Sequence, residues 1–147
     1  MEPTIDAMGE MIRPQFHDGL LFGVIRKDDD VLIHARTRRG ETFVLTLHRI
    51  EAFQCDGFQG HNTITDLFVY FGPTEADPRS ELVLIAELLA GAPHPSAGDK
   101  YKQEYQDRVS KILDRVDRRE LTAMALITAE TCTIDALCSH VTVEKLN

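Results

Sequence analysis

The sequence has few cysteines and no long hydrophobic run. Its three cysteines, Cys55, Cys132 and Cys138, are an odd number among 147 residues, whereas a disulfide-stapled secreted domain usually has an even and larger set. No apolar stretch approaches the roughly 18 residues that a membrane-spanning helix requires. Residues 1–14 also lack the apolar core of a signal peptide. We therefore expect free thiols, no membrane contact and a cytoplasmic location.

The sequence also has fewer positive than negative charges. The chain has 16 Lys and Arg against 24 Asp and Glu, for a net charge of −8, and both halves share the excess. Such a field repels the phosphates of nucleic acid at distances up to a Debye length of about 8 Å. It suits a basic protein partner, which it would attract. We predict no nucleic-acid binding and, for a protein partner, a basic one.

Length and composition are those of an ordinary folded domain. Apolar residues make up 43% of the chain and charged residues 27%, which lies well away from the disordered class. A chain of 147 residues can bury one sizeable core. The sequence therefore predicts a single domain over residues 1–147.

The most informative pattern is an alternation of apolar and polar residues between Phe16 and Phe71. Because successive side chains of a strand point to opposite faces, apolar residues of one parity must share a buried face. Three successive segments show such sets: Phe16, Leu20, Phe22 and Val24; Val31, Ile33 and Ala35; Phe43, Leu45 and Leu47. The pattern predicts three antiparallel strands joined by hairpins.

Residue parity also predicts the register of the first hairpin. A four-residue loop over Lys27–Asp30 places Val24 opposite Ile33 and Phe22 opposite Ala35. Aspartates suit this loop because their side chains accept hydrogen bonds from nearby backbone N–H groups.

The second hairpin requires a loop of three residues. A loop over residues 38–40 places Ile33 opposite Leu45 and Ala35 opposite Phe43. Its last residue, Gly40, then occupies the left-handed position of a type I turn with a G1 bulge, where glycine is favoured. Pattern and turn chemistry agree on this hairpin.

The remainder of the chain predicts two more strands, two helices and a final pair of strands. The strands are expected over 49–55 and 63–71, and the final pair over 122–129 and 134–144. Asp77 and Pro78 resemble an N-cap and first turn for a helix over 80–90, with a buried strand as the alternative for 82–85. An amphipathic pattern predicts a second helix over 99–121.

These elements together indicate the α+β class. We predict an antiparallel β-meander of about five strands, followed by one or two helices and a C-terminal strand pair.

No catalytic or metal-binding motif stands out. His17 and Asp18 are neighbours, and in a strand their side chains would point to opposite faces. Cys132, Cys138 and His140 do not have the close Cys-x2–4-Cys spacing of a structural zinc site. We therefore assign no catalytic residue, no metal ligand and no cofactor.

Two groups of polar residues are candidates for binding. His34, Arg36 and Thr42 share the outer face of the predicted hairpins. This face is a ligand- or partner-binding surface, a solvated face, or a face that the second helix half covers. His61 and Asn62 end a glycine-rich segment, Gly57–Asn62, which could border a pocket between sheet and helix.

The arginine-rich hairpin tip is a third polar feature. Residues 36–39 read Arg-Thr-Arg-Arg, and such a cluster could contact phosphate. Acidic neighbours dilute its charge, which favours a solvated turn.

The stretch 16–71 resembles a group of small bacterial proteins of unassigned function. They share the strand entry Phe-His-Asp-(Ala/Gly), here Phe16–Gly19, and a late asparagine before an apolar strand, here Asn62 before Ile64. Some of these proteins are described as immunity proteins of bacterial toxin systems. The resemblance implies a bacterial source and a binding role, and it implies no catalytic residue.

We therefore predict a non-enzymatic binding module, of which an immunity-like inhibitor is one form. A small enzyme or ligand-binding protein with a pocket between sheet and helix is the alternative. A self-associating subunit, which would form a homo-oligomer, is a third hypothesis.

Overall fold

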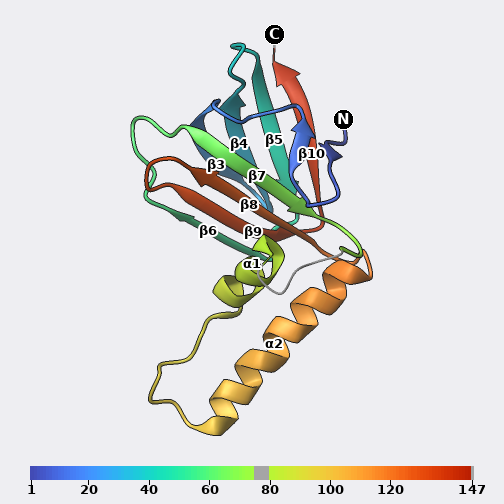
Figure 1. Cartoon of the computed structure of the whole chain (residues 1–147), viewed down its shortest axis with the longest axis vertical. Coiled ribbons are helices and arrows are strands. Elements are labelled where there is room, and N and C mark those ends of the chain that lie inside the picture. Colours follow the sequence, from blue (N-terminus) through green and yellow to red (C-terminus); the bar gives the residue numbers. More distant parts are fainter. Residues whose placement is uncertain (75–79, 147) are drawn as a thin grey trace.

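The protein is an antiparallel β-sandwich with a pair of helices at one end. The computed structural model describes residues 1–74 and 80–146. Two four-stranded sheets face each other, and the helices project from one end of them (Figure 1). This arrangement confirms the predicted α+β class with antiparallel sheets, helices after the first strands and a final strand pair.

The first sheet has the strand order β10-β5-β4-β3. Its strands are β3 (Leu20–Lys27), β4 (Asp30–Arg36), β5 (Thr42–His48) and β10 (His140–Leu146). The predicted register of the second hairpin is confirmed, with Ile33 opposite Leu45 and Ala35 opposite Phe43. Gly40 has the expected left-handed backbone, with φ of 89°.

The first hairpin departs from its prediction at one point. Val24 lies opposite Ile33 as expected, but Leu21 lies opposite Ala35 in place of Phe22, because β3 has a bulge between Leu21 and Gly23. Leu21 is consequently buried, and Phe22 is 47% exposed. The loop is also tighter than predicted, since Lys27 already pairs with Asp30.

The bulge arises because the start of β3 also forms backbone hydrogen bonds with residues 62–64. Leu21 N–H donates to Asn62 O over 2.9 Å, and Ile64 N–H donates to Gly19 O over 2.8 Å. The start of β3 is thereby held against the second sheet while the rest of the strand stays in the first. A bulge bends a strand in this way and shifts its parity by one residue.

The second sheet has the order β6-β9-β8-β7. Its strands are β6 (Ala52–Asp56), β7 (Ile64–Tyr70), β8 (Thr122–Thr128) and β9 (Thr133–Cys138). The five strands of the first half are therefore divided over two sheets, and only β3, β4 and β5 form a continuous meander. The predicted strand over 134–144 is two strands, which pass from one sheet to the other at Ser139.

Two helices, α1 (Glu81–Ala90) and α2 (Asp99–Asp117), cover part of the second sheet. The strand alternative for residues 82–85 is wrong, and α1 ends at Gly91 with φ of 73°. The predicted helix start at Asp77 and Pro78 lies outside the described residues. Arg108 joins the helices, because its Nε donates to Ala90 O over 2.9 Å.

The fold has two separate apolar cores. One lies between the sheets and includes Ile33, Leu45 and Leu126. The other lies between the outer face of the second sheet and the helices, where Ile85 and Val116 are fully buried. A short N-terminal hairpin that the sequence pattern did not predict, β1 (Thr4–Ile5) and β2 (Met11–Arg13), lies beside β7 through the bridge from Glu10 to Phe68.

Among the described residues, no helix is long and apolar enough to span a membrane.

Candidate functional site

The three residues predicted on the first sheet share its outer face. His34 lies opposite Val44, and Arg36 lies opposite Thr42, as expected. The helices pack against the other sheet, so they do not cover this face. The bulge places Phe22 beside two of the three residues. The centroid of its ring lies 5.9 Å from that of His34, in an edge-on arrangement, and 5.8 Å from Arg36 Cζ.

His61 and Asn62 lie elsewhere, in the loop between β6 and β7. His61 is exposed, and its Nε2 lies 3.2 Å from Thr63 Oγ1. Asn62 is 1% exposed, and its amide is used within the fold: Nδ2 donates to Gln59 O and Leu21 O, and Oδ1 accepts from Gln59 N–H. No hydrogen bond or ion pair of the described chain joins this loop to His34, Arg36 or Thr42.

Three cavities lie outside the segment Gly57–Asn62, where the sequence placed a pocket. One, of about 1020 Å³, lies beside the N-terminal hairpin and the β4–β5 turn. A second, of about 370 Å³, lies between the N-terminal residues and β7, and a third, of about 450 Å³, lies at the β3–β4 turn. None of these three includes a residue of Gly57–Asn62 or of a helix.

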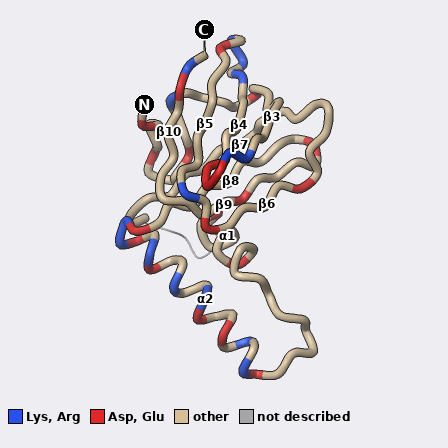
Figure 2. Tube along the Cα trace, turned by 180° about the vertical axis from the view of Figure 1, so that it is seen from behind, with Lys and Arg blue, Asp and Glu red and all other residues tan. Residues whose placement is uncertain are grey.

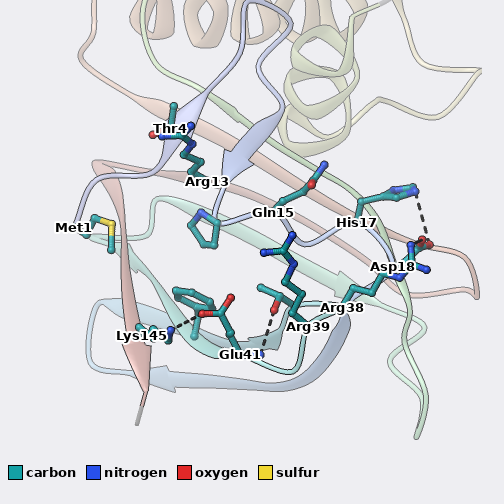
Figure 3. A pocket seen from close by; sticks show the side chains of 13 residues that line it. Met1, Thr4, Arg13, Gln15, His17, Asp18, Arg38, Arg39, Glu41 and Lys145 are labelled. Atoms are coloured by element: carbon teal, nitrogen blue, oxygen red, sulfur yellow. Dashed lines mark hydrogen bonds and ion pairs between the residues drawn. The ribbon is translucent and has the colours of Figure 1, made fainter.

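His17 and Asp18 lie closer together than the sequence predicted. They form a turn before β3, with Asp18 in the left-handed region at φ of 61°, so strand alternation does not apply to them. The two side chains point toward each other, with His17 Nε2 3.7 Å from Asp18 Oδ1 (Figure 3). His17 Nδ1 lies 2.7 Å from Thr65 O. Both ring nitrogens therefore face acceptors, which favours the doubly protonated ring.

We expect His17 to titrate above the usual value of 6.5. Its pKa is raised first by the hydrogen bond to Thr65 O and then by the charge of Asp18. Because the folded-state pKa is the higher one, any stability from this charge is present below pH 6.5 and is lost as pH rises through the folded-state pKa. An NMR titration of the imidazole protons measures the pKa, and Asp18→Asn should lower it. A pKa at or below 6.5 would contradict this arrangement.

The outer face of the second sheet collects acidic side chains at the end that α1 leaves open. Three rows of outward residues cross it, in the strand order β6-β9-β8-β7: Asp56, Thr133, Ile127 and Asp66; then Gln54, Asp135, Ala125 and Phe68; then Ala52, Leu137, Ala123 and Tyr70. The third row and part of the second pack against the helices. The first row carries two aspartates and lies beyond the helices.

Four carboxylates form what we call the acidic face: Asp56, Asp66, Asp135 and, at the start of α1, Glu81. Burial raises the pKa of Asp135 to about 6, and the charges of Glu81 and Asp56 add to the shift. Burial and the charge of Asp66 likewise raise the pKa of Glu81. Within residues 1–74 and 80–146, no Lys, Arg or His lies within 4 Å of these four carboxylates.

The acidic face was not visible in the sequence. Gln54 and Asp56 share one parity in their segment, and Thr133 and Asp135 share one in theirs. Their common surface depends on β6 pairing with β9, across 76 intervening residues between Asp56 and Thr133. No local signal in the sequence specifies that pairing.

The cysteines have the environment of inert thiols. All three are free, and Cys132 and Cys138 are buried. Burial is the main cause that raises the pKa of Cys132 to about 11 and that of Cys138 to about 12, and a thiol of high pKa reacts slowly. Among the described residues, no group of three or more His, Cys, Asp and Glu side chains could hold a metal ion.

Comparison with known proteins found no similar protein. No protein-family model, no curated protein and no solved structure matches this chain.

Proposed function

We propose that the protein is a non-enzymatic binding module whose acidic face binds a basic segment of another protein. One observation carries the proposal: the partly buried Asp66, Asp135 and Glu81 and the exposed Asp56 gather at an open sheet face with no cation of the described chain beside them. Ionised carboxylates that lose water without gaining a partner are destabilising. Lys or Arg side chains of a partner would supply the missing charge.

The surroundings of the acidic face also suit a protein segment. Phe68 is half-buried between the face and α1 and offers apolar contact beside the charges. Gln54 and Thr133 add hydrogen-bonding side chains to the first two rows. Such a mixture of a small apolar centre and surrounding polar groups is common in protein interfaces.

A basic partner agrees with two further properties of the chain. The net charge of −8 would speed the encounter with a positively charged protein. The resemblance of residues 16–71 to immunity proteins fits the same role, in which an inhibitor would cover a basic surface of a toxin.

The test compares two variants of equal charge. The triple variant Asp56→Asn, Asp66→Asn, Asp135→Asn weakens the acidic face. The control Asp28→Asn, Asp29→Asn, Glu144→Gln removes three exposed charges elsewhere. Proteins that bind the wild type are identified by mass spectrometry, purified and titrated by calorimetry. We expect a basic partner whose dissociation constant rises about tenfold or more with the triple variant and stays within about twofold with the control.

Two results would overturn the proposal. One is a purified partner that binds the triple variant as tightly as the wild type. The other is equal weakening by both variants, because it would show a general effect of net charge. Circular dichroism of each variant establishes that both are folded.

A further inference from the structure

Positive charge gathers around the cavity of about 1020 Å³. Figure 2 shows basic segments on the β4–β5 turn and near the C-terminal end of β10, at the end of the molecule away from the helices. Four side chains of permanent positive charge line the cavity: Arg13, Arg38, Arg39 and Lys145. They come from β2, from the β4–β5 turn and from β10.

Two of these four cations have partners within the protein. Lys145 Nζ forms an ion pair with Glu41, and Arg38 Nη1 lies 3.7 Å from Asp18 Oδ2. These are the only two carboxylates among the residues that line the cavity. Within the described parts of the chain, no carboxylate lies within 4 Å of Arg13 or Arg39. Two guanidinium groups at the cavity are therefore free to bind an anion.

The turn that carries Arg39 is well braced. Thr37 is 8% exposed, its N–H donates to Glu41 O over 2.8 Å, and its Oγ1 accepts from Glu41 N–H over 3.2 Å. Gly40 N–H donates to Thr37 O over 2.9 Å. Arg39 extends from this turn toward the segment that carries Gln15 (Figure 3). The backbone that presents Arg39 is therefore held by hydrogen bonds on both sides of the turn.

We propose that this cavity binds a small molecule that carries one or two phosphate groups, with Arg13 and Arg39 as the cations that attract them. A guanidinium presents planar, parallel N–H donors that match two oxygens of a phosphate. Gln15 and Thr4 line the same cavity and add neutral hydrogen-bonding groups for the remainder of the ligand. A volume of about 1020 Å³ lies just above the range of about 300–1,000 Å³ that is usual for small-molecule sites.

The charges around the cavity favour a small ligand over nucleic acid. Asp18 and Glu41 lie at the cavity itself, and the whole chain carries a net charge of −8. A long polyanion would extend past the cavity into the negative field of the whole chain, whereas a ligand with one or two phosphates would stay within the cavity. The site is separate from the acidic face, since no residue is shared between the two.

The test measures binding of pyrophosphate by calorimetry at constant ionic strength. The double variant Arg13→Gln, Arg39→Gln removes both unpaired guanidinium groups, and the control Lys102→Gln, Arg118→Gln removes two exposed cations from α2 and its end. We expect the dissociation constant of pyrophosphate to rise about tenfold or more with the double variant. With the control it should stay within about twofold.

Further arms identify the chemistry of the ligand. Inorganic phosphate should bind more weakly than pyrophosphate, and citrate tests carboxylates at similar charge. Three results would overturn the proposal: no saturable binding of pyrophosphate up to about 10 mM, equal loss in the control variant, or tighter binding of citrate or of a single-stranded oligonucleotide. The triple variant of the acidic face should bind pyrophosphate as the wild type does, so failure of one proposal leaves the other standing.

Discussion

Replacing Asn62 with alanine is expected to lower the free energy of unfolding by about 2–4 kcal/mol. The side chain is 1% exposed, and its three hydrogen bonds join the β6–β7 loop to itself and to β3. Nδ2 donates to Gln59 O over 2.7 Å and to Leu21 O over 3.3 Å, and Oδ1 accepts from Gln59 N–H over 2.9 Å. Alanine would leave those backbone groups without these partners. Urea denaturation at neutral pH measures the loss.

The neighbouring residue provides the control for this prediction. His61 is exposed, and its Nε2 lies 3.2 Å from Thr63 Oγ1, so His61→Ala should change stability by less than about 0.5 kcal/mol. A similar small effect for Asn62→Ala would contradict the structural role that we assign to this amide. The binding role predicted for Asn62 from the sequence remains a prediction, and the large cost of the substitution means that it has to be tested by a ligand titration.

Replacing Asp135 with asparagine is expected to raise stability at pH 7 by about 2 kcal/mol. Burial is the main cause that raises the pKa of this carboxyl from 3.8 to about 6. Taken at face value, that difference corresponds to about 3 kcal/mol, and solvent screening of a half-buried side chain reduces it. Asparagine has nearly the same shape and carries no charge. Thermal and urea unfolding of wild type and variant at pH 7 measure the gain.

The pH dependence of stability gives a second measure of the same effect. Because the folded-state pKa of Asp135 is above the unfolded value, the folded protein binds the proton more tightly. This contribution is fully present below about pH 4 and is lost as pH rises through about 6. Between these values the wild type should therefore lose stability that Asp135→Asn retains.

A matched control separates burial from net charge. Asp29 is exposed on the β3–β4 turn, and Asp29→Asn removes the same charge without relieving a buried carboxyl. It should change stability by less than about 0.5 kcal/mol. Equal gains in stability from Asp135→Asn and Asp29→Asn would show that the net charge of −8, and not burial of a carboxylate in the acidic face, destabilises the wild type.

Local patterns were sufficient for the register of the β4–β5 hairpin, and for α1 they favoured a helix over the strand alternative. In the hairpin, parity and the glycine of a G1 bulge specify the same register, and the structure has Ile33 opposite Leu45. In α1, a largely apolar segment ends at Gly91 in the left-handed conformation. These features depend on residues that are close in the chain, so the sequence contains nearly all of their information.

Long-range pairing caused the departures from prediction. Strand β3 begins against residues 62–64, at the start of β7, and the bulge that results exposes Phe22 and buries Leu21. Parity alone cannot reveal a bulge, because the alternation continues on both sides with a shift of one residue. Parity also could not identify the partner of β6, because that partner, β9, lies in the last fifteen residues.

The sequence by itself determined the class of this protein, the β4–β5 register, the presence of the second helix and the excess of negative charge, and it favoured a helix over residues 80–90. These follow from residue type, spacing and composition. Only the tertiary structure decided where charge is concentrated: it brings four carboxylates onto one sheet face and four basic side chains from three segments around one cavity. The physical reason is that electrostatic interactions depend on distance in space, and the distances between strands far apart in the chain are set by pairings that no local pattern encodes.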